Sequence, residues 1–188
     1  TIGYRTKTGL GYQALSYVKN LSVSKVMVVD LSGHNGMPLT DWYPGAMTVH
    51  GYPSRHDIAE FLIGLDVVLL AETPLNYYLY EHARKAGIKT AAVINWEFFD
   101  HIVHPEFPLP DMIIMPTSWH FKDAEAFCIS RGIRCLLLRH PVDRRDFPFR
   151  LRTTAKMLHV AGKPAVHDRN GTWDFLKAAP NGTVVTQS

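Results

Sequence analysis

The chain has 188 residues, enough for one well-packed α/β domain and part of a second. Its content of 46% hydrophobic and 20% charged residues argues against intrinsic disorder and against a membrane span. The formal net charge is +3, and acidic residues interrupt the most basic segment, residues 139–152, so the charge does not favour a nucleic-acid-binding protein.

Up to Pro141, short β-branched runs alternate with runs of helical periodicity, which is typical of βαβ units and a mostly parallel sheet. The expected strands are residues 2–5, 25–31, 46–52, 66–72, 89–95, 111–116 and 133–140. The expected helices are residues 12–20, 54–64, 74–87 and 118–132. Ser54 and Ser118 are the expected N-caps of two of these helices. The buried face of the first helix is expected to consist of Leu15, Tyr17, Val18 and Leu21.

The alternation then restarts, with an expected strand at residues 156–163, a helix at 170–179 and a strand at 181–188. One strand–helix–strand unit is too small to bury its own apolar surface. We therefore expect it to pack on the first domain, on another chain, or on a further segment.

The sequence shows no basic-then-apolar leader, and its longest apolar stretch, around residues 67–71, is far too short to cross a bilayer. The two cysteines, Cys128 and Cys135, lack the C-x-x-C spacing of metal and redox motifs. We expect a cytoplasmic protein without a membrane span, whose thiols are reduced and buried.

Gly9 and Gly11 follow the first expected strand, within the segment TGLGYQ. Because glycine lacks a Cβ, the backbone there can approach a ligand closely, and the following helix directs its N-terminal amides at the same point. The pair falls short of the dinucleotide fingerprint G-x-G-x-x-G, because Ala14 stands at the third glycine position. A ligand cradle and a tight turn between strand and helix both explain the pair.

Polar residues end two very apolar strands: Glu72 ends one, and Asn95 and Glu97 end the next. The carboxyl ends of parallel strands gather at one edge of the sheet, where ligands bind. We treat these three as candidate catalytic residues that would hydrogen-bond a hydroxyl-bearing acceptor. Capping of the strand ends, or a hydrogen bond that supports another site residue, is the structural alternative.

The strand-end segments also contain three aromatic side chains that could stack on a sugar ring or a base, or pack in the core. These are Tyr77, Trp96 and Trp119. The nearby segment FFDHIVHPEF holds a group whose spacing could suit a metal, namely Asp100, His101 and His104. No further ligand pair supports one, so we predict surface histidines and no metal site.

The second series contains a strand, a glycine, a basic and polar loop, and a helix start, an arrangement suited to a diphosphate. Lys163 and Arg169 would supply positive charge, and helix amides would donate hydrogen bonds. The candidate residues of this site are Gly162, Lys163, Arg169, Asn170, Gly171 and Thr172. An Asn-Gly turn followed by an N-cap is the alternative explanation.

Several segments in register resemble GT-B glycosyltransferases of the "glycosyltransferases group 1" type, especially the short versions encoded in actinobacterial phages. The segments are TGLGYQ, MPTSWHFKDAEAFCISRGI, HPVDRRDF and HVAGKPAVHDRNGTWDFLKA. In that family a strand before Pro-Ser precedes a helix, a strand, and an Asn-Gly-Val-Asp-like turn into the nucleotide-sugar domain. Here Thr117-Ser118 and His140-Pro141-Val142-Asp143 stand at these places.

The resemblance implies a Rossmann-like acceptor-side domain over residues 1–149, a linker over 150–155, and the beginning of a nucleotide-sugar-binding domain over 156–188. It places Gly9 and Gly11 in a glycine loop facing the donor diphosphate. It implies a UDP- or GDP-sugar donor, no other cofactor, and an acceptor hydroxyl on a protein, a glycan or a modified DNA base. If phage-encoded, the protein would act in the host cytoplasm.

The resemblance also carries a departure. The family's Glu-containing donor motif lies late in the second domain, and this sequence does not contain it. The alternative is therefore a non-catalytic binding or interaction module derived from a glycosyltransferase. Such a module could form a homo-oligomer through its incomplete second unit.

Overall fold

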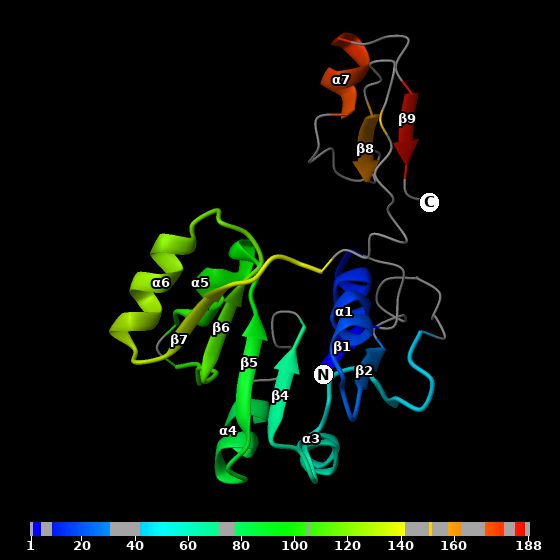
Figure 1. Cartoon of the computed structure of the whole chain (residues 1–188). Coiled ribbons are helices and arrows are strands. Elements are labelled where there is room, and N and C mark those ends of the chain that lie inside the picture. The colour runs from blue at the N-terminus through cyan, green and yellow to red at the C-terminus, as the bar shows by residue number, and fades with distance from the viewer. Residues whose placement is uncertain are drawn as a thin grey trace. The chain divides into compact units, whose positions relative to one another are not determined.

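The computed structural model describes residues 2–4, 9–30, 42–71, 78–104, 106–141, 151, 158–162, 172–178 and 183–186. The chain divides into two compact units, Thr1–Asp146 and Phe147–Ser188, shown in Figure 1.

The first unit is built on a seven-stranded sheet in the order β3-β2-β1-β4-β5-β6-β7, and every neighbouring pair is parallel. The strands are β1 Ile2–Tyr4, β2 Met27–Asp30, β3 Met47–His50, β4 Val67–Leu70, β5 Lys89–Val93, β6 Met112–Met115 and β7 Arg134–Leu137. The order reverses between β1 and β4, as in doubly wound folds. The prediction of a Rossmann-like α/β fold is confirmed.

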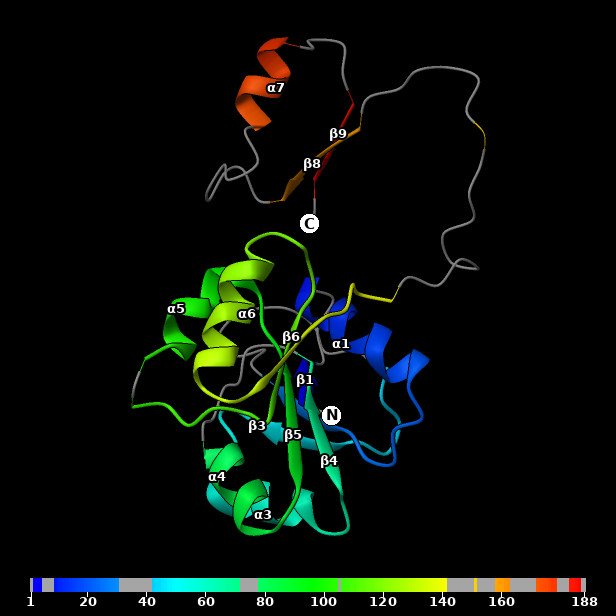
Figure 2. The same cartoon turned by 60° about the vertical axis from the view of Figure 1, so that its left-hand side comes forward.

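Helices cover both faces of this sheet. They are α1 Gly9–Asn20, α3 Arg55–Leu62, α4 Tyr78–Lys85, the short 3-10 helix η1 Trp96–Phe98, α5 Phe99–Ile102 and α6 Phe121–Ser130. Figure 2 shows α1 on one side of the strands and α3 to α6 on the other. Alternate residues of β5 lie on opposite faces of the sheet. Ala92 packs in the cluster beneath α3 to α6, and Ala91 and Val93 pack with α1.

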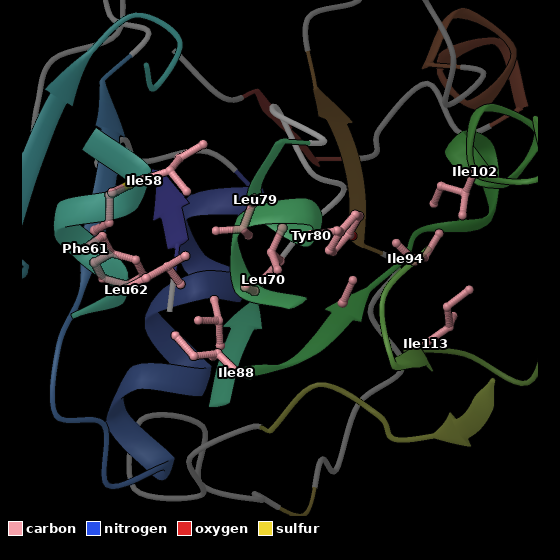
Figure 3. Close-up of a cluster of buried hydrophobic side chains, with 14 of the residues drawn as sticks. Ile58, Phe61, Leu62, Leu70, Leu79, Tyr80, Ile88, Ile94, Ile102 and Ile113 are labelled. Atoms are coloured by element: carbon pink, nitrogen blue, oxygen red, sulfur yellow. The ribbon is translucent and has the colours of Figure 1, made fainter. Parts of the chain in front are cut away.

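The larger cluster forms the main core (Figure 3). Ile58 from α3, Leu79 from α4 and Ile113 from β6 are each at most 1% exposed. Full burial of one such side chain contributes about 1.5–3 kcal/mol to folding. This packing holds the strands, and therefore their carboxyl ends, in fixed positions.

Helix α3 begins where the sequence predicts. Ser54 is its N-cap, and the Ser54 hydroxyl accepts a hydrogen bond from the Asp57 amide at 3.2 Å. The Asp57 carboxylate in turn accepts from the Ser54 amide at 2.7 Å, which completes a capping box. Gly64, with φ of +75°, follows the helix end.

Helix α1 departs from the prediction at its start and at its buried face. It begins at Gly9, three residues before the expected Tyr12, so both glycines lie within its first turn. Tyr17 is buried as predicted, at 2% exposed, but the unpredicted Ala14 is buried with it, at 1%, and the expected face residue Leu21 is 47% exposed. The small side chain of Ala14 lets the helix lie close to the sheet, which is the role of the third position in glycine-rich turns.

Helix α6 also starts differently. Ser118 was the expected N-cap, but the helix begins at Phe121 and its N-cap position is occupied by His120. Both thiols are free: Cys128 on α6 is fully buried, and Cys135 on β7 is partly buried. Burial raises the pKa of Cys128 to about 12, so this thiol stays protonated and unreactive at neutral pH.

The second unit is a parallel β-α-β arrangement. It consists of β8 Leu158–Gly162, α7 Thr172–Ala178 and β9 Thr183–Thr186, and β8 pairs directly with β9. The strand, helix and second strand follow the predicted order. Across both units, no helix within the described ranges is long and apolar enough to cross a membrane.

Candidate functional site

The carboxyl edge of the first sheet is where the topology directs a ligand. Strands β1 and β4 are neighbours, and the helices that follow them, α1 and α4, pack on opposite faces. At such a switch point the connecting loops separate and leave a crevice. The residues after each strand are therefore the candidate site.

The first turn of α1 is tied to the end of β4. The Gln13 side-chain amide donates a hydrogen bond to the Ala71 carbonyl at 3.1 Å, and Gly11 is buried. The expected glycine loop is therefore a helical turn at Gly9 and Gly11, because the helix starts earlier than predicted. Residues 5–8 and Glu72 lie outside the described residues, so their part in the site stays a prediction.

The end of β5 carries two of the predicted residues. Asn95 occupies the N-cap position of η1, and its side chain makes no capping hydrogen bond. Its backbone carbonyl instead accepts a hydrogen bond from the Phe98 amide at 3.0 Å. Glu97 lies in the middle of η1, and the side chain of Glu97 lies outside what the structure describes. The Asn95 side chain therefore does not cap η1, and its roles as an acceptor-binding group or as a strand-end cap stay predictions.

Aromatic rings from the ends of β5 and β6 meet at this edge. The Trp96 ring stacks on His120 with centroids 4.2 Å apart and 9° between planes, and on Phe99 with centroids 4.9 Å apart. Trp119 meets Trp96 edge to face at 6.5 Å and is 64% exposed. We call Trp96, Phe99, Trp119 and His120 the strand-end aromatic cluster. The structure thus brings the predicted Trp96 and Trp119 together, while Tyr77 lies outside the described residues.

His120 is the strained member of this cluster. Its φ of 53° and ψ of 19° lie in the left-handed region, and among the described non-glycine residues only His120 has a positive φ. This conformation costs about 1–3 kcal/mol in an L-residue. The His120 Nδ1 lies 2.8 Å from Asp123 Oδ2. A carboxylate oxygen accepts, so the Nδ1–H of His120 is the donor in this contact.

A second histidine–aspartate pair lies at the ends of β2 and β3. Asp30 and His50 are register partners on these neighbouring strands, and Asp30 Oδ2 lies 2.8 Å from His50 Nδ1. The Asp30 side chain is 5% exposed and the His50 side chain 78%. Sequence reasoning missed both residues, although Asp30 gives the same signal as Glu72, an acid ending an apolar strand.

Of the predicted donor residues in the second unit, the structure describes two. Gly162 is the last residue of β8, and Thr172 is the first residue of α7 and 1% exposed. The segment between them holds the other four, and it lies outside the described residues. These are Lys163, Arg169, Asn170 and Gly171.

Within the described ranges, no group of three or more His, Cys, Asp or Glu side chains could hold a metal ion. His104 instead packs against the ring of Phe107, with centroids 5.5 Å apart. A cavity of about 500 Å³ lies at the other edge of the sheet, where Val26 precedes β2 and Met47 begins β3. It is therefore distinct from the carboxyl-edge site.

Comparisons with known proteins give no assignment. No protein-family model matches the chain, and no curated protein matches it significantly. The functional interpretation is therefore based on the residues and their geometry.

Proposed function

We propose that the chain is a nucleotide-sugar-dependent glycosyltransferase of the GT-B type, or the N-terminal part of one. The observation that carries the proposal is the succession of a Rossmann-like unit and a second parallel β-α-β unit. The donor would be a UDP- or GDP-sugar, and the acceptor a hydroxyl on a protein, a glycan or a modified DNA base. Two free thiols fit a reducing compartment such as the cytoplasm.

The proposed reaction assigns different tasks to the two units. In a retaining transferase, catalysis requires mainly a neutralised leaving diphosphate and an aligned acceptor hydroxyl. Lys163 and Arg169 would neutralise the diphosphate, with Asn170 to Thr172 providing helix-start donors. Asn95, Glu72 and Glu97 would position the acceptor at the carboxyl edge of the first sheet.

A non-catalytic binding module is the second candidate. It is favoured by the described strand-end groups of the first unit, which stack and hydrogen-bond and so are suited to binding. This candidate predicts ligand or partner binding, including self-association, without sugar turnover.

The test is release of nucleoside diphosphate from a panel of UDP- and GDP-sugars, with and without hydroxyl acceptors. The proposal expects release above the protein-free rate and at least about tenfold less release in the double variant Lys163→Ala, Arg169→Ala. Lys177→Ala is the matched control, because Lys177 is exposed on α7 and pairs only loosely with Asp174, at 3.5 Å. Binding of a sugar nucleotide without release would favour the binding module, and full release by the double variant would remove the assignment of the donor residues.

A further inference from the structure

We propose that the strand-end aromatic cluster is a binding subsite for an uncharged pyranose ring, with Trp119 as its stacking face. As an assignment of the acceptor in sugar transfer, this inference rests on the proposed function. As a sugar-binding site it stands on the geometry of the cluster alone.

The cluster is a preorganised surface with a buried base. Phe99 is 5% exposed and meets Phe127 of α6 edge to face at 5.6 Å. Trp96 stacks on Phe99, and Trp119 rests against Trp96 with 64% of its surface open to solvent. A flat apolar ring that is exposed and also held from behind loses little conformational entropy when a ligand covers it.

The backbone at His120 supports a ligand-binding role. A positive φ is uncommon in any residue other than glycine, and among the others it is found most often in asparagine, aspartate and histidine. At this position the histidine places its imidazole flat against Trp96, with its Nδ1 bonded to the Asp123 carboxylate. Strain of this kind concentrates at functional sites, where the surrounding structure holds it in place.

The chemistry around the cluster selects a neutral, hydroxyl-rich ligand. The imidazole of His120 is the hydrogen-bonding group in contact with the rings, and Asn95, which precedes Trp96 in the chain, is the polar residue at the N-cap of η1. Among the described contacts of the cluster there is one carboxylate, that of Asp123, and no lysine or arginine. These contacts therefore offer no basic side chain to pair with a phosphate. A pyranose presents weakly positive C–H groups to the negative face of an aromatic ring and hydroxyls at its rim.

The chain contains four tryptophans, Trp42, Trp96, Trp119 and Trp173, so one NMR titration follows four indole N–H signals at once. The ligands are the methyl glycosides of glucose, galactose, mannose and N-acetylglucosamine, with uridine as the nucleoside comparison, each up to about 100 mM. We expect at least one glycoside to shift the Trp119 and Trp96 signals saturably. Trp42 and Trp173 serve as internal controls and are expected to stay unchanged.

Three variants sharpen the result. Trp119→Ala is expected to weaken glycoside binding at least about tenfold, and Trp119→Phe only a few-fold, because a ring is kept. His120→Asn has a residue that tolerates positive φ and removes the stack on Trp96. We therefore expect a loss of glycoside affinity between the losses in the two Trp119 variants. Tyr52→Ala is the control, since Tyr52 is 65% exposed and lies beyond β3, away from the cluster. The three remaining indole signals report that Trp119→Ala is folded.

The proposal is overturned if no glycoside moves the Trp119 signal, if all four indoles move alike, or if uridine alone saturates it. Unchanged binding by Trp119→Ala also overturns it. No donor is present in this titration, so the result is independent of the transfer reaction. Glycoside binding without nucleoside diphosphate release would keep the subsite and remove the proposed reaction.

Discussion

The molecule contains two histidine–aspartate pairs of nearly identical geometry in opposite surroundings. In both, Nδ1 lies 2.8 Å from a carboxylate oxygen. At the ends of β2 and β3 the aspartate is buried, with 5% of the Asp30 side chain exposed, and its histidine is in solvent. At the end of β6 the relation is reversed, because the Asp123 side chain is 67% exposed and the His120 side chain 37%.

The difference separates a structural pair from a ligand-binding one. A carboxylate taken out of water needs its hydrogen bonds for the fold to be stable, so His50 serves Asp30. An exposed carboxylate gains little from a surface partner, so Asp123 serves mainly to orient His120 against Trp96. The same contact therefore contributes to stability at one end of the sheet and to site geometry at the other.

The largest expected effect is on stability at the buried pair. Asp30→Ala should lower the free energy of unfolding by about 2 kcal/mol, because charged hydrogen bonds of a buried group are lost. The matched change Asp123→Ala should lower it by less than about 1 kcal/mol. Urea unfolding of both variants measures the contrast. Equal losses would contradict the division between a structural and a ligand-binding pair.

The next effect concerns the backbone at His120. His120→Gly should be more stable than His120→Ala by about 1 kcal/mol, because alanine keeps the penalty of positive φ and glycine does not. At Lys122, an exposed position within α6, the order should reverse, with alanine the more stable by up to about 1 kcal/mol. Thermal or urea unfolding of the four variants shows, at each position, whether glycine or alanine gives the more stable protein. The same order at both positions would mean that His120 is not strained.

The smallest effect extends the comparison to a third histidine near the strand ends. His140 lies against Tyr17 of α1, with ring centroids 5.7 Å apart, and burial lowers its pKa. Among the described residues, neither His140 Nδ1 nor the Tyr17 hydroxyl has a hydrogen-bond partner. We therefore expect His140 to make the stability of the fold depend on pH.

The sign of that pH dependence follows from linkage. At a pH above the ordinary histidine pKa of about 6.5, His140 is neutral in both states and its contribution to stability is fully present. As the pH falls, the unfolded chain takes up the proton first, so stability is lost down to the folded pKa. The lowered pKa values of Asp57 and Asp111 act at lower pH, below their ordinary value of 3.8. The pH range in which His140 affects stability is therefore separate from the range of these two carboxylates.

We accordingly expect a decline in the free energy of unfolding between about pH 7 and pH 5 that is smaller in His140→Phe. Phenylalanine keeps a ring against Tyr17 and has no titrating nitrogen. Tyr17→Phe is the control, because it removes the neighbouring buried hydroxyl but leaves His140 to titrate, so its decline should match the unaltered chain. Identical pH profiles for His140→Phe and the unaltered chain would contradict the assignment.

The sequence predicts the sheet well because strands such as Val67–Leu70 and Met112–Met115 are short apolar runs, and such runs can be recognised from the local sequence alone. The Ser54 cap is predictable for a similar reason, since the capping box is a local pattern. The N-terminus of α6 is not, because Ser118 has the better capping side chain and nothing local indicates that His120 takes a left-handed conformation. In the fold, His120 stacks on Trp96, which comes from a different strand end.

The candidate site is predictable residue by residue but not as an arrangement. Asn95, Trp96 and Trp119 all stand out as polar or aromatic residues after apolar strands. These three residues lie close together only because β5 and β6 are adjacent in the sheet. The order of the strands determines this adjacency, and the local sequence does not show it. The pairing of Asp30 with His50 is hidden for the same reason, because β2 and β3 meet only in the folded sheet.

The most direct test of the proposed sugar subsite is the glycoside affinity of Asp30→Ala and Trp119→Ala in the same indole titration. We predict that Asp30→Ala binds within about twofold of the unaltered chain at a temperature where it is folded, and that Trp119→Ala binds at least about tenfold more weakly. The reverse outcome, affinity lost in Asp30→Ala and kept in Trp119→Ala, would contradict it and move the ligand to the ends of β2 and β3.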